Sequence, residues 1–258
     1  MVASLTPAGI HISREGVDHS ALQLVLVHGA MDSSDSMSKL AAALSEHPVV
    51  RYDRRGYGRS APTRQIAPPS LTDHIDDLRS IVGDTPTVLV GHSLGATISL
   101  AVAQALPDQV LGVMGYEPPL PWESWWPAPP LPTKGADTYE VQCAAERFMR
   151  RAMGDRRWEE LDDARRAHFL SWGPVWAAEL RDAGRRRVFS AADLAVPVVV
   201  AYGSDSDDRH RRGAAALAGE LPGAQLVELT GGTHTAHRRR PDDLARLVHD
   251  LVNRVADS

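Results

Sequence analysis

Short, continuous apolar runs alternate along the chain with segments of helical spacing, and this alternation constrains the fold more than any other feature. The runs are apolar at successive positions rather than at every second one, as expected for strands that are covered on both faces. Six candidate strands are Leu22–Val27, Val49–Tyr52, Thr87–Val90, Val110–Tyr116, Val196–Tyr202 and Gln225–Leu229. Four candidate helices are Leu71–Val82, Leu94–Leu106, His210–Leu221 and Pro241–Val255. The pattern predicts an α/β fold with a mostly parallel central sheet flanked by helices.

The alternation is interrupted after Glu117. Seven of the eighteen prolines lie within residues 118–132, a density that neither a helix nor a central strand tolerates. Charged, amphipathic stretches of helical spacing follow, at about 137–153, 156–170 and 174–187. We therefore expect residues 118–196 to form a helical lid (cap), inserted into a core made of residues 1–117 and 197–258.

Composition and charge exclude several classes of protein. The chain is 43% hydrophobic and 24% charged, which are values of a folded globular protein. Its net charge of -5 offers no basic surface for nucleic acid or for an anionic membrane. A single cysteine, Cys143, fits a reducing compartment, and no signal peptide or membrane-spanning apolar run is visible. We expect a cytoplasmic protein without metal or cofactor; its oligomeric state stays open.

One short motif carries chemistry. Gly91-His92-Ser93-Leu94-Gly95 matches G-x-S-x-G and lies between a candidate strand and a candidate helix. At such a turn the glycines permit a tight backbone path that exposes the serine oxygen above the sheet. The following helix directs its N–H groups and the positive end of its dipole toward the serine. Ser93 is therefore the candidate nucleophile.

Three further segments complete a resemblance. His28-Gly29-Ala30 ends a candidate strand, residues 52–60 read YDRRGYGRS, and Gly-Gly-Thr-His precedes the last helix. Together with the serine turn, they resemble the α/β-hydrolase superfamily over nearly the whole chain apart from the lid. The resemblance implies that two backbone N–H groups stabilise an oxyanion. By position these belong to Ala30, with Gly29 as the neighbouring alternative, and to Leu94.

The resemblance also implies a base and an acid. A serine hydroxyl needs a base to remove its proton, and His234 matches the family's catalytic histidine. The family usually places the acid where Ser206 stands here, with Asp205 and Asp207 on either side. Some members instead carry it after the strand that follows the nucleophile helix, where this chain has Glu117. We favour Glu117, with Asp207 and Asp205 as alternatives.

The lid should select the substrate. Its segments 162–168 and 173–176 resemble zearalenone-type lactone hydrolases, whose triad uses a glutamate after the same strand. All six tryptophans lie between positions 122 and 176. We expect about half of them to form the lid's own core, and Trp176, Trp126 and Met31 to line an apolar pocket above Ser93. No convergent arginine or lysine site for a phosphate or coenzyme A tail stands out in the sequence.

These features together predict a serine esterase or lactonase. The expected partner is a small, bulky hydrophobic ester or lactone, cleaved through an acyl-enzyme. Two alternatives remain: a hydrolase that cleaves a C–C bond with the same triad, and a weakly catalytic small-molecule receptor of the same fold.

Overall fold

An eight-stranded sheet forms the centre of the molecule. The computed structural model describes residues 2–17, 22–60, 67–127 and 130–256. Within them the strand order is β1-β2-β4-β3-β5-β6-β7-β8, antiparallel at the β1–β2 and β2–β4 pairs and parallel from β4 to β8. The strands are β1 (Val2–Leu5), β2 (His11–Glu15), β3 (Gln23–Val27), β4 (Val49–Tyr52), β5 (Thr87–His92), β6 (Val110–Tyr116), β7 (Val198–Gly203) and β8 (Gln225–Leu229).

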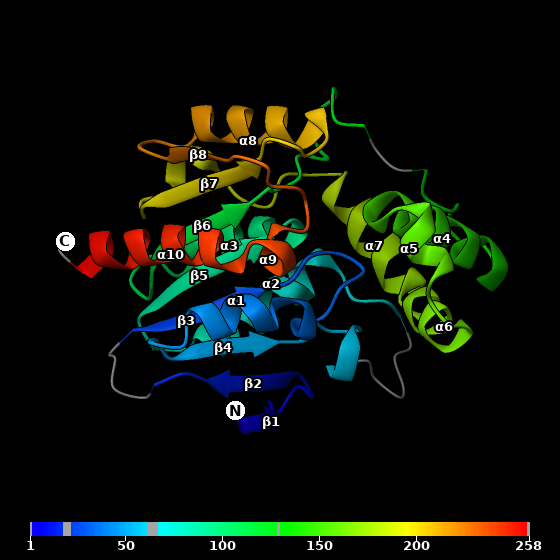
Figure 1. Ribbon diagram of the computed structural model, residues 1–258, viewed down its shortest axis with the longest axis horizontal. Helices are drawn as coiled ribbons and strands as arrows, with labels where there is room; N and C mark the ends of the chain where they lie inside the picture. Colours follow the sequence, from blue (N-terminus) through cyan, green and yellow to red (C-terminus); the bar gives the residue numbers. More distant parts are fainter. Residues whose placement is uncertain (1, 18–21, 61–66, 128–129, 257–258) are drawn as a thin grey trace.

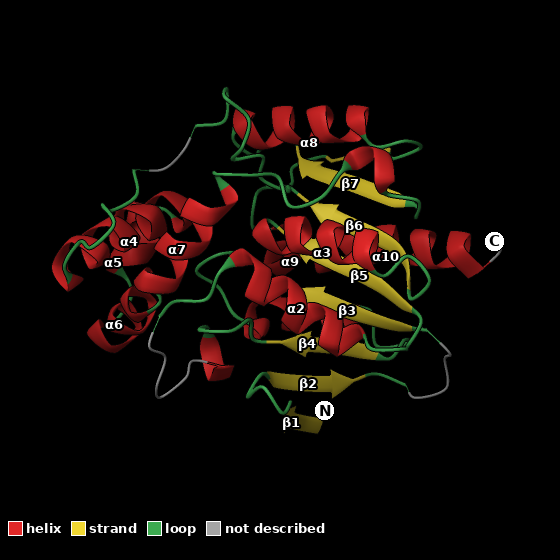
Figure 2. Cartoon of the chain, turned by 180° about the vertical axis from the view of Figure 1, so that it is seen from behind, coloured by secondary structure: helices red, strands yellow, loops and turns green. Residues whose placement is uncertain are grey.

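Helices cover both faces of this sheet (Figures 1 and 2). On one face α2, α3 and α8 pack apolar side chains such as Ile98 and Leu217 against the strands, and on the other α1, α9 and α10 contribute Leu40 and Val248. These helices are α1 (Ser38–Ala43), α2 (Leu71–Val82), α3 (Leu94–Ala105), α8 (Asp208–Glu220), α9 (Ala236–Arg239) and α10 (Pro241–Ala256). Three 3-10 turns are η1 (Ser34–Met37), η2 (Gly58–Ser60) and η3 (Ala191–Asp193). No helix in the described ranges is both long and apolar enough to cross a membrane.

The chain between β6 and β7, residues 117–197, forms a helical insertion beyond the carboxyl ends of the parallel strands (Figure 1). Its helices are α4 (Thr138–Met153), α5 (Asp155–Glu159), α6 (Asp163–Ser171) and α7 (Gly173–Ala183). They enclose an apolar cluster that contains Trp158, Trp172 and Trp176 and also takes in Met31 and Tyr57 from the core. Shared side chains of this kind join the insertion to the sheet domain.

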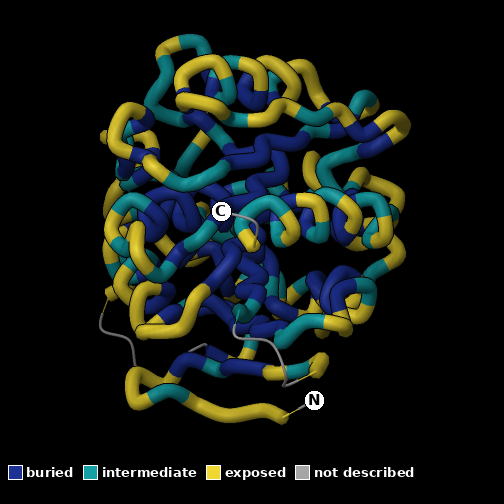
Figure 3. Tube along the Cα trace, turned by 90° about the vertical axis from the view of Figure 1, so that its left-hand side faces the viewer, coloured by how far each residue is buried: buried dark blue, intermediate teal, exposed yellow. Residues whose placement is uncertain are grey.

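The expected α/β fold with a mostly parallel sheet is confirmed, and the additional elements lie mainly at its margin. A hairpin of β1 and β2 extends the sheet beyond β4, and every residue of β1 is exposed (Figure 3). The stretch expected as one helix at 156–170 is divided into α5 and α6. The parallel strands β3 to β8 still place their carboxyl ends along one edge, where ligands of open α/β sheets commonly bind.

Candidate active site

Ser93 stands in a tight turn between β5 and α3. Its backbone has φ 53° and ψ -126°, and its N–H donates to the Tyr116 carbonyl at 2.8 Å. A Cβ on Gly91 would lie 2.4 Å from Ala96 Cα, and one on Gly95 would lie 2.2 Å from the Val27 carbonyl oxygen. Both clashes involve backbone atoms, which cannot move aside. The two glycines are therefore required for the turn that exposes Ser93.

Strained backbone conformations occur at three positions of the expected site. In the described part of the chain the non-glycine residues with positive φ are Met31, Ser93 and Glu117. Each follows the carboxyl end of a strand, namely β3, β5 and β6. Such a conformation is unfavourable for an L-residue and persists only where the surrounding structure imposes it, typically at functional sites. All three residues are members of the site expected from the sequence.

Glu117 contacts the imidazole of His234. The distance from Glu117 Oε2 to His234 Nδ1 is 2.6 Å, and Glu117 Oε1 accepts bonds from the Gly203 N–H at 2.9 Å and from the Ser206 hydroxyl. The carboxylate is fully buried. Although burial alone would raise the pKa of Glu117, the contacts with His234, His210 and Ser206 lower it to about 2. Glu117 is thus ionised at neutral pH and fixes the orientation and the tautomer of His234.

The alternative acids lie elsewhere. Asp205 and Asp207 are exposed; the Asp205 N–H donates to the Gly232 carbonyl, and Asp207 lies 3.5 Å from Arg209. Within the described chain neither carboxylate bonds to His234. Ser206, at the position where the family usually carries its acid, donates its hydroxyl to Glu117 instead. The side-chain geometry thus places Glu117, rather than either aspartate, against the histidine.

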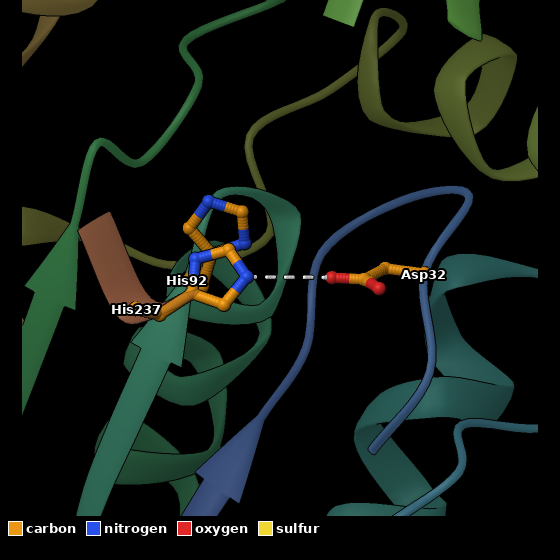
Figure 4. Close-up of side chains that lie close together, drawn as sticks. All are labelled: Asp32, His92 and His237. Atoms are coloured by element: carbon orange, nitrogen blue, oxygen red, sulfur yellow. Dashed lines mark ion pairs between the residues drawn. The ribbon is translucent and has the colours of Figure 1, made fainter. Parts of the chain in front are cut away.

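His92, His237 and Asp32 form a buried cluster that contacts the loop carrying His234. His92 Nε2 donates to the His234 carbonyl at 2.8 Å, and the ring centroids of His92 and His237 are 4.0 Å apart. His237 Nε2 lies 3.7 Å from a carboxylate oxygen of Asp32 (Figure 4). The same carboxylate also pairs with Arg238 at 2.7 Å. Burial, followed by the neighbouring His234, lowers the pKa of His92 to about 3. His92 therefore stays neutral and holds the backbone of the loop that carries His234.

His210 covers the other side of His234, a contact that sequence reasoning missed. The two rings are stacked at 4.3 Å with an interplanar angle of 21°, and Trp126 meets His210 edge-on at 5.8 Å. His210 Nδ1 lies 3.7 Å from Glu117 Oε2. Burial is the main cause that lowers the pKa of His210, to about 2, so the ring is neutral. No motif marks this histidine, because its position depends on how α8 packs beside the His234 loop.

The Gly29–Ala30 peptide, which carries the candidate oxyanion N–H, is fixed by hydrogen bonds to its carbonyl group. The Gly29 carbonyl accepts bonds from Arg54 Nη2 at 2.9 Å and from His28 Nδ1 at 2.8 Å. This carbonyl shares one planar trans peptide with the Ala30 N–H, so fixing the carbonyl also fixes the N–H in the opposite direction. Leu94 is the first residue of α3, and its N–H has no acceptor within the helix. Neither N–H donates a hydrogen bond to any residue that the structure describes, so both can stabilise charge on a substrate oxygen.

Ser93, His234, Ala30 and Leu94 line one cavity of about 560 Å³. Within the described residues the Ser93 hydroxyl makes no hydrogen bond, and such bonds often tighten only when substrate binds. Trp126 and Met31 line the same cavity. Trp176 does not. It is fully buried in the apolar cluster of the insertion, where its ring centroid lies 5.2 Å from that of Phe148, because α7 turns this side chain toward α4.

Comparison with known proteins agrees with this arrangement. The sequence model of the Alpha/beta hydrolase family matches residues 24–247. Lipase LipV of Mycobacterium tuberculosis is 31% identical over 112 residues, which are 42% of this chain and 41% of that protein. The chain thus spans about two fifths of the length of the curated relatives it matches.

Solved structures show the same fold over nearly the whole chain. An alpha/beta hydrolase from Sphaerobacter thermophilus is 24% identical with a TM-score of 0.67, covering 97% of this chain and 100% of the other. The enol-lactonase from Burkholderia xenovorans is 20% identical with a TM-score of 0.70, covering 95% and 96%. These likenesses agree with the sheet topology described above, and the match of the family model over residues 24–247 shows that the chain belongs to the Alpha/beta hydrolase family.

Proposed function

We propose that the protein is a serine hydrolase that cleaves a carboxylic ester or lactone of a bulky hydrophobic substrate through an acyl-enzyme. One observation carries the proposal: the 2.6 Å contact between Glu117 and His234, at a cavity that also contains the strained Ser93. A nucleophile, a base and an orienting acid in this relation are the arrangement that activates a serine hydroxyl.

The reaction follows from these positions. Ser93 Oγ attacks the substrate carbonyl carbon while His234 takes its proton, and the N–H groups of Ala30 and Leu94 stabilise the oxyanion that forms. His234 then gives the proton to the departing alkoxide, and the acyl group stays on Ser93. A water molecule, deprotonated by His234, attacks the acyl-enzyme; the bond between the acyl carbon and Ser93 Oγ then breaks, His234 returns the proton to Ser93 Oγ, and the acid is released. With a lactone, acid and alcohol remain joined in one product.

The substrate class is argued from the cavity. Its wall includes large apolar side chains from both the core and the insertion, among them Met31, Trp126 and Phe148, and burial of apolar surface contributes about 25 cal/mol per Å². A relative named as a lipase supports ester hydrolysis. An acid after β6 is the arrangement of the lactone hydrolases that the insertion resembles, which supports the lactone alternative.

Substitution of Ser93 tests the proposal. Ser93→Ala should lower kcat for para-nitrophenyl butanoate by about 10⁵–10⁶-fold, since the nucleophile is lost. Ser80→Ala, which removes an exposed hydroxyl on α2, is the matched control and should keep full activity. A fluorophosphonate should add its mass to the wild type and to Ser80→Ala but not to Ser93→Ala. Retained turnover in Ser93→Ala would refute the mechanism. In the wild type, a single burst of product without further turnover would favour the receptor alternative.

A further inference from the structure

Five arginines converge on the cavity of the candidate site. They come from the insertion and from the core and are Arg151, Arg181, Arg185, Arg209 and Arg238. Among the described residues, three with carboxylates line the same cavity, namely Asp32, Asp205 and Asp207, and the ionised Glu117 contacts His234 at the site. The chain as a whole is acidic, with a net charge of -5. An excess of positive charge at the cavity is therefore a local feature of the folded chain, one that sequence spacing does not reveal.

The arginines differ in how far they are neutralised. Arg238 pairs with Asp32 at 2.7 Å, and Arg181 Nη2 donates to the Pro132 carbonyl at 2.7 Å. Arg151, in the last turn of α4, and Arg185, just after α7, make no side-chain hydrogen bond or ion pair with any residue that the structure describes. Their guanidinium groups are available to a ligand.

Arg209 is linked to the candidate triad through His210. Its Nε donates to His210 Nε2 at 3.3 Å, and the His210 ring is stacked on His234. The Arg209 side chain is only 24% exposed, whereas its carboxylate neighbour Asp207, at 3.5 Å, is 68% exposed. Burial is the main cause that lowers the pKa of Arg209, and the charge of Arg151 lowers it further. The positive charges of Arg151 and Arg209 thus act on each other; the carboxylates of Asp207 and Glu117 oppose this effect but do not outweigh burial and the charge of Arg151.

We infer that the substrate carries an anionic oxygen group, a carboxylate in the simplest case, which binds to Arg151, Arg185 and Arg209 in the cavity while its apolar part contacts Trp126 and Met31. The inference rests on the proposed function and narrows its substrate class to amphiphilic acids. A guanidinium offers several N–H donors, and its hydrogen bonds to carboxylate are about twice as strong as neutral ones. Such a group would replace the weak, exposed partner Asp207.

Matched ester pairs test the inference by turnover. One pair is para-nitrophenyl hydrogen glutarate and its neutral amide twin, which carry charge or no charge in the acyl part. The other is para-carboxyphenyl butanoate and its carbamoyl twin, with the difference in the leaving group. We expect kcat/KM for at least one charged ester to exceed that of its twin about tenfold at low salt, and the ratio to fall as ionic strength rises.

Arginine variants test whether the preference for charged esters arises from the arginines of the cavity. Arg151→Gln/Arg185→Gln should lower the charged-to-neutral ratio about tenfold. The control Arg156→Gln/Arg186→Gln removes two positive charges that do not line the cavity. Arg156 pairs with Glu160, and Arg186 bonds to Thr72. This control should leave the charged-to-neutral ratio within about twofold of the wild-type value. A ratio near one in the wild type, or equal ratios in both double variants, would overturn the inference.

Equilibrium binding separates this inference from the proposed function. Calorimetric titration of Ser93→Ala with phenylbutanoate and with phenylbutanamide needs no turnover. A Kd about tenfold lower for the carboxylate, lost in the Arg151→Gln/Arg185→Gln background, would support the anion site even if no ester is hydrolysed. Equal affinities would overturn it, and ester hydrolysis that depends on Ser93 would then leave the proposed function standing.

Discussion

At the scale of single residues, Glu117 joins the carboxyl ends of β6 and β7 to the histidine loop. Glu117→Gln keeps the shape of the side chain but removes the charge that stabilises the His234 imidazolium. We expect kcat for an ester to fall by about 10⁴-fold, with a much smaller effect on KM. Asp205→Asn and Asp207→Asn should change kcat only a few-fold. Similar losses in all three variants would contradict the assignment of Glu117.

The acidity of Glu117 also predicts how stability changes with pH. Its pKa in the folded protein is about 2, against an ordinary value of 4.5. A lowered pKa means that ionised Glu117 stabilises the fold above about pH 4.5 and that this contribution, on the order of 3 kcal/mol, is lost as pH falls toward 2. Urea unfolding of the wild type between pH 6 and 3 should therefore show a steeper loss of stability than Glu117→Gln. Parallel curves would exclude this role, because other carboxylates act equally in both proteins.

Some residues of the site could be located from the sequence and others could not. A strand pattern and a short motif identify Ser93, whereas Ala30 and Glu117 were implied only by the family resemblance, with Gly29 as an alternative to the first and Asp207 and Asp205 as alternatives to the second. Ser206 and Arg209 matter through the path of the turn after β7 and through the packing of α8. Spacing along the chain carries no information on such contacts, because a change of one residue in a loop redirects every side chain in it.

At the scale of elements, α7 fixes the insertion to the loop that carries the candidate oxyanion peptide. Glu179 on α7 is fully buried; it pairs with Arg54 at 2.7 Å and accepts a bond from the Tyr57 hydroxyl at 2.5 Å. Arg54 in turn holds the Gly29 carbonyl. One helix of the insertion thus reaches the Ala30 N–H through a chain of buried charges.

Neutralising Glu179 should therefore affect both stability and catalysis. Glu179→Gln leaves Arg54 buried without its counter-charge, so we expect the free energy of unfolding to fall by about 3–5 kcal/mol. Turnover should fall as well, since Arg54 is then free to leave Gly29. Glu160→Gln, in an exposed pair with Arg156 at 3.8 Å, should cost about 0–1 kcal/mol. Urea denaturation and kcat measure both effects; equal stability of the two variants would contradict the role of α7.

The elements themselves were predictable where burial dominates. Central strands such as β4 and β6 are covered on both faces, and their apolar runs mark them from end to end. The edge strand β1 is exposed along its whole length, so no apolar pattern identifies it. The division between α5 and α6 has a local cause: Asp162 accepts a bond from the Arg165 N–H at 2.8 Å and caps the new helix. That signal is present in the sequence but is weaker than the helical period around it.

At the scale of the whole molecule, the site depends on segments that are far apart in the chain. Ala30, Ser93, Glu117 and His234 follow different strands or precede the last helix, and they meet only because parallel strands end at the same edge of the sheet. The insertion leaves and rejoins the sheet at this edge, between β6 and β7. Arg151, Arg181 and Arg185 of the insertion therefore line the same cavity as Ser93 and His234. The proposed catalysis and the proposed substrate binding would take place in this one cavity.

This connection predicts how the molecule unfolds, and the tryptophans make it measurable. All six lie between positions 122 and 176: Trp158, Trp172 and Trp176 pack in the insertion, and the other three pack against the core cluster. Tryptophan fluorescence therefore reports on this region, whereas far-ultraviolet circular dichroism averages over the sheet and all helices. Because Glu179 and Arg54 join the two parts by a buried ion pair, we expect both signals to give the same urea midpoint in the wild type.

The fluorescence and circular dichroism midpoints should differ when the Glu179–Arg54 ion pair is removed. In Glu179→Gln the insertion loses its buried ion pair with the core and keeps the apolar contacts to Met31 and Tyr57, so the fluorescence midpoint should move to lower urea than the circular dichroism midpoint. In Glu160→Gln the two curves should still coincide, since an exposed pair adds little to the contact. If the wild-type fluorescence changes at clearly lower urea than the circular dichroism, the insertion unfolds independently of the core. In that case α7 could not position the candidate oxyanion peptide through the Arg54–Gly29 contact.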